Sequence, residues 1–147
     1  MPNHPVIDME KAALIRWCKG DPDGFLEISA DDVVYFDPYL SARLDGLQRL
    51  TAHYDGIRGK IFAPRHEMIE PHVQEIGDVA VLTFRFVSWS PNSATAMRWN
   101  CTEVYRRQAE TWRIIQTHWS FTGGKPESGL GCAREAQSAP SSRARLL

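Results

Sequence analysis

The sequence lacks several features that would assign it to a special class of protein. Its 147 residues contain no apolar run of about 18 residues, which a membrane-spanning helix needs, and no basic region followed by an apolar core at the N-terminus. We therefore expect no membrane partner and no secretion signal. Lys and Arg number 17 and Asp and Glu 18, so the formal net charge of -1 gives no reason to expect a nucleic-acid partner.

Cysteine is scarce, and its spacing excludes two further classes. Cys18, Cys101 and Cys132 are far apart and odd in number, which fits neither a zinc site nor a redox pair. Reduced thiols in the cytoplasm are the simplest interpretation. The same holds for histidine, because no pair has the spacing of metal ligands. We predict no metal and no cofactor.

What is present is typical of a soluble globular domain. Hydrophobic residues make up 43% and charged residues 24%, and the chain is long enough to bury a core. From Gly123 onward the composition shifts to Gly, Ser, Pro and Ala without an apolar period. We therefore predict one domain over residues 1–122 and a mostly disordered tail over 123–147.

The order of apolar patterns predicts the fold class. Helical spacing marks residues 7–19, a short stretch after Asp21 and residues 46–60, with one strand ending at Asp37 between them. The apolar period then changes to two, which predicts strands at about 66–76, 78–89, 96–107 and 111–121. Three helices before an antiparallel meander indicate an α+β fold, in which the helices pack on a strongly bent, mainly antiparallel sheet that forms a cone.

The strand at 79–87 suggests a partner. Neither of its two faces is polar, so the outer face of the sheet also needs a cover. We expect a homodimer or a larger homo-oligomer formed through that face.

Asp37 is the most informative single residue. Val33, Tyr35 and Asp37 share one face of the predicted strand, and Pro38 follows directly. A carboxylate on an apolar face needs a partner or a use. One interpretation is that Asp37 caps the following turn, and the other is that it acts as a general base whose pKa burial has raised. The stretch alone leaves both open.

Three motifs resemble the nuclear transport factor 2-like superfamily, the SnoaL-like and ketosteroid-isomerase-like group. The first is Gly20-Asp21-Pro22-Asp23-Gly24 continuing to Phe36-Asp37-Pro38. The second is Asp45-Gly46-Leu47, which opens a helix ending in His53-Tyr54. The third runs from Glu103-Val104-Tyr105 to Thr117-His118-Trp119 and is also similar to the association domain of calcium/calmodulin-dependent protein kinase II. The resemblance covers about residues 6–122.

The resemblance places a catalytic base at Asp37 and a supporting tyrosine at Tyr54. The two usual oxyanion donors fall near Ala13 and Thr102, so both are absent here, which argues against steroid isomerisation. Strand parity and the resemblance together predict an aromatic cone with Asp37, Tyr54 and Tyr35 as catalytic candidates. The predicted ligand-binding residues are Trp17, Phe84, Phe86, Asn100, Thr102 and Trp119.

Two classes of function remain open at this stage. One is a protein that binds a small hydrophobic molecule, with an isomerase, cyclase or lyase activity in which Asp37 moves a proton. The other is a non-catalytic assembly or protein-interaction domain with a vestigial pocket. The same superfold serves both, so the fold alone does not decide between them.

Overall fold

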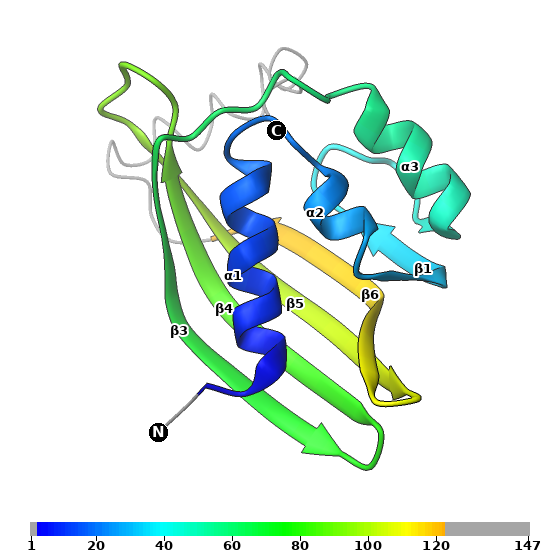
Figure 1. The fold of residues 1–147 in the computed structure, drawn as a ribbon. Coiled ribbons are helices and arrows are strands. Elements are labelled where there is room, and N and C mark those ends of the chain that lie inside the picture. The colour runs from blue at the N-terminus through cyan, green and yellow to red at the C-terminus, as the bar shows by residue number, and fades with distance from the viewer. Residues whose placement is uncertain (1–2, 123–147) are drawn as a thin grey trace.

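The computed structural model describes residues 3–122 and has the predicted α+β architecture (Figure 1). The predicted tail at 123–147 lies outside the described residues. In chain order the elements are α1 (Pro5–Trp17), α2 (Asp23–Leu26), β1 (Ser29–Phe36), β2 (Leu44–Asp45), α3 (Leu47–Asp55), β3 (Arg65–Ile76), β4 (Val79–Trp89), β5 (Ala96–Gln108) and β6 (Thr111–Phe121).

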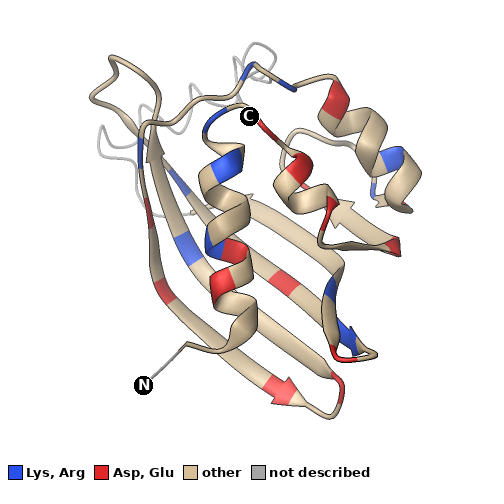
Figure 2. Ribbon diagram, viewed as in Figure 1, with Lys and Arg blue, Asp and Glu red and all other residues tan. Residues whose placement is uncertain are grey.

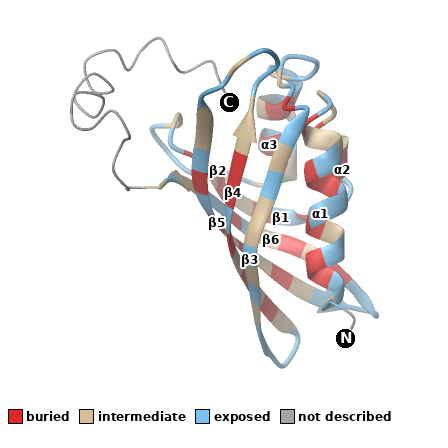
Figure 3. Ribbon diagram, turned by 90° about the vertical axis from the view of Figure 1, so that its left-hand side faces the viewer, coloured by how far each residue is buried: buried red, intermediate tan, exposed pale blue. Residues whose placement is uncertain are grey.

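One mixed sheet forms the body of the molecule. Its strand order is β2-β1-β6-β5-β4-β3, and β1 and β6 are the only parallel neighbours within residues 3–122. The predicted meander corresponds to β3–β6, with strand ends close to those expected. All three helices lie on one side of the sheet, as Figures 1 and 3 show from two directions.

Three helix boundaries differ clearly from the prediction, and one of them is the end of α1 at Trp17 instead of residue 19. Helix α1 begins earlier than expected because Pro5 suits the first helical turn and the His4 side chain accepts a hydrogen bond from the Val6 N–H (3.2 Å). Helix α3 ends at Asp55 instead of residue 60. Two glycines interrupt the expected continuation, and Gly59 has a φ of +77°, which a helix does not allow.

Two register shifts within the meander β3–β6 accompany the bend of the sheet, and a third lies between Ser29 and Val34 in the pairing of β1 with β6. In β3 the pairing with β4 shifts between Ile69 and His72, where Glu70 adopts a φ of 49°. The second shift lies between Val104 and Tyr105 in the pairing of β5 with β6. Such bulges increase local twist and bending, and the helices cover the resulting concave face.

The inner face of the sheet holds the core. Buried and exposed positions alternate along the strands, and the helices bury the side that faces the sheet (Figure 3). Leu82 on β4 and Ile114 on β6 are fully or almost fully buried there, and Leu14 of α1 belongs to the same core cluster. Acidic and basic positions are spread over many elements (Figure 2). No helix within residues 3–122 is long and apolar enough to cross a membrane.

Candidate functional site

The concave side of the sheet encloses a cavity of about 300 Å³ between the strands and the helices. This volume is at the small end of the range for ligand pockets, so it suits a molecule of one or two rings. Eight aromatic side chains in its wall come from helices, strands and a loop: Trp17, Phe25, Tyr35, Tyr54, Phe62, Phe86, Trp99 and Trp119.

The aromatic rings hold one another by edge contacts. The Trp119 ring lies 5.9 Å from that of Phe86 and 5.8 Å from that of Trp99, and the Trp17 ring lies 5.0 Å from that of Tyr54. These centroid distances and the steep angles between the planes are those of favourable aromatic pairs. The wall is therefore preformed and offers ring faces and edges to a flat apolar molecule.

Asp37 contributes a carboxylate to this wall, and both of its oxygens have partners. It directly follows β1 and is 5% exposed. Its Oδ1 accepts a hydrogen bond from the Tyr39 N–H (2.8 Å), which is the predicted cap of the turn. Its Oδ2 accepts one from the Tyr35 hydroxyl (2.9 Å) and lies 3.4 Å from Nε2 of His53 on α3. The two interpretations of Asp37 therefore do not exclude each other.

The pKa of Asp37 is shifted in the direction opposite to the prediction. Burial is the largest single influence and acts to raise it, as expected. The hydrogen bonds from His53, the Tyr39 backbone and the Tyr35 hydroxyl together outweigh burial, so the pKa lies below its ordinary value. Asp37 is consequently ionised at neutral pH, and its basicity is reduced while these donors are in place.

Tyr35 and Tyr54 form a short hydroxyl chain that leads to Asp37. The two tyrosines hydrogen-bond to each other, and Tyr35 in turn donates to Asp37. Burial is the main reason that the pKa of each hydroxyl is well above its ordinary value, so both stay protonated and able to donate. The structure thus brings all three predicted catalytic candidates together at the cavity.

The predicted ligand-binding residues fall into two groups. Trp17, Phe86 and Trp119 line the cavity. Phe84 is buried behind the wall, with its ring 5.8 Å from that of Trp119, and does not line the cavity.

Asn100 and Thr102 were placed on the wrong side of β5. Asn100 is exposed and Thr102 is half-buried, whereas their neighbours Cys101 and Glu103 are buried on the inner face. Since successive residues of a strand point to opposite faces, Asn100 and Thr102 belong to the outer face.

His53 is the residue that the sequence analysis missed. Its ring contacts Asp37 only because α3 packs across the end of β1, a contact between residues 16 positions apart. No local pattern indicates such a pair, although His53 and Tyr54 occur together in the motif that resembles the superfamily. Lys60, Ser88 and Ser90 also line the cavity and add the polar groups that an aromatic pattern does not reveal.

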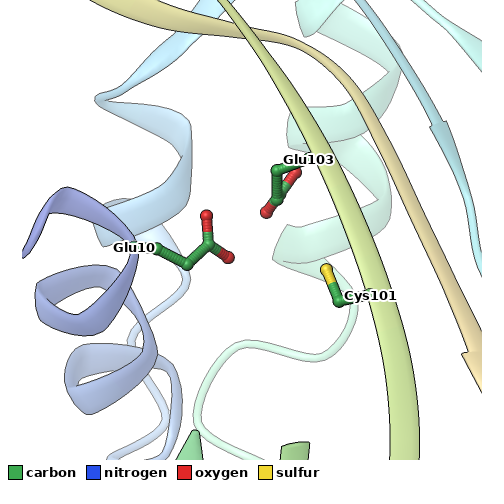
Figure 4. A group of neighbouring side chains, drawn as sticks. All are labelled: Glu10, Cys101 and Glu103. Carbon is green, nitrogen blue, oxygen red and sulfur yellow. The ribbon is translucent and has the colours of Figure 1, made fainter. Parts of the chain in front are cut away.

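A second polar cluster lies in the core between α1 and β5 (Figure 4). Glu10 of α1 and Glu103 of β5 are both 0% exposed, and the thiol of Cys101 lies beside them. Burial is the largest influence on both carboxyl groups and raises the pKa of each. Among the described residues this is the only group of three potential metal ligands.

The comparisons with known proteins agree with this architecture. Residues 12–123 match the family model described as a SnoaL-like domain. A structure from Parabacteroides distasonis described as a "putative ketosteroid isomerase" is 43% identical, with a TM-score of 0.72 over 80% of this chain and 86% of that one. No curated protein sequence matches.

Two more distant structures show the same fold. A nuclear transport factor 2-like protein of unknown function from Pseudomonas putida is 24% identical, with a TM-score of 0.73 over 85% of this chain and 89% of that one. The hub of the calcium/calmodulin-dependent kinase from S. rosetta is 21% identical, with a TM-score of 0.66 over 83% of this chain and all of the other, 100%. From the matched family model and the identity to the first structure, the chain belongs to the SnoaL-like family.

Proposed function

We propose that the protein binds a small, flat hydrophobic molecule in the aromatic cavity and that Asp37 moves a proton on it. The observation that carries this proposal is a buried, ionised carboxylate in a wall made mostly of aromatic and other apolar side chains. A charge in such a place is unfavourable unless it is held by donors, and three donors hold it here. The reaction class is a cofactor-independent isomerisation, cyclisation or elimination.

The surrounding groups have separate roles in this proposal. Tyr35 and His53 hold Oδ2 of Asp37 and keep the carboxylate ionised. Tyr54, at the far end of the hydroxyl chain, turns its hydroxyl to the oxygen of a bound carbonyl and stabilises the developing enolate. When the Tyr54 hydroxyl turns to the substrate, Tyr35 loses its hydrogen bond to Tyr54. The Tyr35 hydroxyl can then also turn from Asp37 to the substrate, and Asp37, with one donor fewer, becomes basic enough to accept the proton.

The similar protein from P. distasonis supports proton transfer next to a carbonyl as the chemistry, because its description names a ketosteroid isomerase. The substrate here need not be a steroid. Ala13 stands where the resemblance places the donor tyrosine, and it is buried without a hydroxyl. A small ring ketone fits both the cavity volume and the single carboxylate.

Binding is tested first by a thermal-shift screen of apolar ring ketones. We expect hits to raise the melting temperature of the wild type and of Asp37→Asn, since the substitution keeps the shape of the side chain. A ligand at 100 times its Kd should stabilise the protein by about 2.7 kcal/mol. Asp45→Asn is the matched control, because Asp45 is exposed and pairs with Arg43 away from the cavity.

Proton transfer is then tested by deuterium exchange. A bound ketone with an acidic α-hydrogen is incubated in D₂O and followed by NMR. The wild type and Asp45→Asn should exchange the α-hydrogen, and Asp37→Asn should bind without exchange. Exchange by Asp37→Asn at the wild-type rate would disprove the catalytic role of Asp37. Binding without exchange in all three proteins would show that the protein binds the ketone but does not catalyse proton transfer.

We also propose that the protein forms a homo-oligomer through the outer face of the sheet. Val81 on β4 is paired with Val104 on β5, and both are only half-buried in the single chain. Light scattering after gel filtration tests this, and Val104→Glu should lower the measured mass. A cytoplasmic location also remains a proposal, supported by Cys18 and Cys101, which are free thiols buried in the domain.

A further inference from the structure

The buried pair of Glu10 and Glu103 presents an electrostatic problem that the proposed function does not use. Both side chains are 0% exposed and come from α1 and β5, which pack face to face. Two ionised carboxylates in an apolar core are strongly unfavourable without a compensating charge. Neither forms a salt bridge within residues 3–122, so the described residues provide no cation to compensate them.

One oxygen of each carboxylate accepts a hydrogen bond from a residue outside the Glu10–Glu103 pair. The Tyr105 hydroxyl donates to Oε1 of Glu10 (2.6 Å), and the Thr117 hydroxyl donates to Oε1 of Glu103. The donors are themselves buried. This arrangement fixes the orientation of both carboxyl groups, in the way that outer hydrogen bonds orient the carboxylates of metal sites.

The other oxygens have no such outside donor. Oε2 of Glu10 and Oε2 of Glu103 are fully buried, and within the described part of the chain they lack a hydrogen-bond donor unless one of the two carboxyl groups is protonated and donates to the other. Figure 4 shows the two carboxyl groups directed toward each other. The space between them is therefore a place for a positive charge.

Cys101 adds a third donor atom of a different kind. It precedes Glu103 by two residues, so both side chains point from the same face of β5. Its sulfur and one oxygen from each glutamate lie within 4.8 Å of one another. A set of one sulfur and two oxygens suits zinc, which binds both thiolates and carboxylates.

We propose that Glu10, Cys101 and Glu103 bind a divalent cation, with Zn²⁺ the expected ion, as a structural site that joins α1 to β5. A divalent ion balances the two carboxylates as two protons would, and a Cys101 thiolate would add one negative charge to the site. The site is closed to solvent, so the ion enters as the chain folds. This proposal is independent of the activity at Asp37.

Metal content is measured on the full chain without an affinity tag, because histidine tags bind zinc. The protein is purified from zinc-supplemented cells and also refolded from denaturant with either Zn²⁺ or a chelator. We expect one zinc ion per chain by inductively coupled plasma mass spectrometry. The melting temperature should be higher after refolding with Zn²⁺ than after refolding with chelator. Exposure of the folded protein to chelator should remove the ion only slowly.

Matched variants locate the ion. Cys101→Ala and Glu103→Gln should lose the zinc, while Cys18→Ala, which removes the other buried thiol of the described domain, should retain it. Tyr105→Phe removes only the outer hydrogen bond to Glu10 and should weaken zinc binding about tenfold. If one of the first two variants fails to fold, the wild-type metal content and the Tyr105→Phe affinity still test the proposal.

Two results would overturn it. One is a wild type that contains no zinc and whose melting temperature is unchanged by refolding with Zn²⁺. The other is zinc retained by both Cys101→Ala and Glu103→Gln. The pair would then be neutralised by protons, which infrared spectroscopy at neutral pH would show as a protonated carboxyl band that disappears in Glu103→Gln.

Discussion

The hydroxyl of Tyr105 on β5 donates a 2.6 Å hydrogen bond to Oε1 of Glu10 on α1, between residues 95 positions apart in the chain. This bond ties the first helix to the centre of the sheet inside the core. Its strength matters because both partners are fully buried, and an unpaired group in such a place costs more than a typical hydrogen bond contributes.

Tyr105→Phe should therefore destabilise the protein by roughly 1–3 kcal/mol, even with a chelator present to keep the protein free of metal. Urea unfolding measures the difference. The double-mutant cycle with Glu10→Leu, which removes the acceptor, separates the hydrogen bond from other effects of each change. If the two substitutions were simply additive, the bond between these groups would not contribute to stability.

Truncating a core side chain on β4 should cost much more than truncating an exposed one nearby. Leu82 is 0% exposed, and Leu82→Ala should lower the free energy of unfolding by about 2–5 kcal/mol. Ile76 at the end of β3 is 71% exposed, so Ile76→Ala should change it by less than about 0.5 kcal/mol. Similar losses for both variants in urea would contradict the burial of Leu82 and the exposure of Ile76.

Asp37 should make the protein sensitive to acid. Because its pKa is lower in the folded state than in the unfolded chain, it contributes stability above the unfolded value of about 4. That contribution is lost as the pH falls through the lower folded value. The stability difference between wild type and Asp37→Asn should therefore shrink as the pH is lowered from 6 to 2, and a constant difference in urea unfolding would contradict the shift.

Two glycines allow backbone strain and steric clash to be compared. Gly20 and Gly59 have φ values of +86° and +77°, so alanine at either position should cost roughly 1–2 kcal/mol in backbone strain. A Cβ at Gly20 would also lie 2.9 Å from the Phe62 ring, whereas a Cβ at Gly59 would meet nothing within 4 Å. Gly20→Ala should be the more destabilising in thermal unfolding, and equal effects would mean that the Phe62 ring simply moves aside.

The sequence analysis succeeded where local patterns determine the structure. The period of two predicted the four long strands, and the two-residue spacing of Tyr35 and Asp37 placed both on one face. It failed on β5 because Glu103 is a charged residue on the buried face. Glu103 on the buried face and Val104 on the outer face both run against the usual pattern, so polarity alone separates the two faces of this strand poorly.

The direction of the Asp37 pKa shift and the role of His53 could not be predicted from the sequence, because both depend on contacts between distant parts of the chain. Burial was predictable from the apolar strand, but the balance between burial and hydrogen bonding depends on where α3 packs. His53 reaches Asp37 across a contact that no local spacing encodes. The direction of a pKa shift is thus a property of the assembled site.

The two oxygens of Asp37 also constrain how the protein can be redesigned. Oδ1 holds the backbone of the turn after β1, so replacing Asp37 with a residue that cannot accept a hydrogen bond would disturb the chain as well as the chemistry. Phe86 and Trp119 also line the cavity, with rings that pack against each other. A library that varies those two positions and keeps Asp37 could therefore alter which molecules the cavity accepts while the reacting group stays fixed.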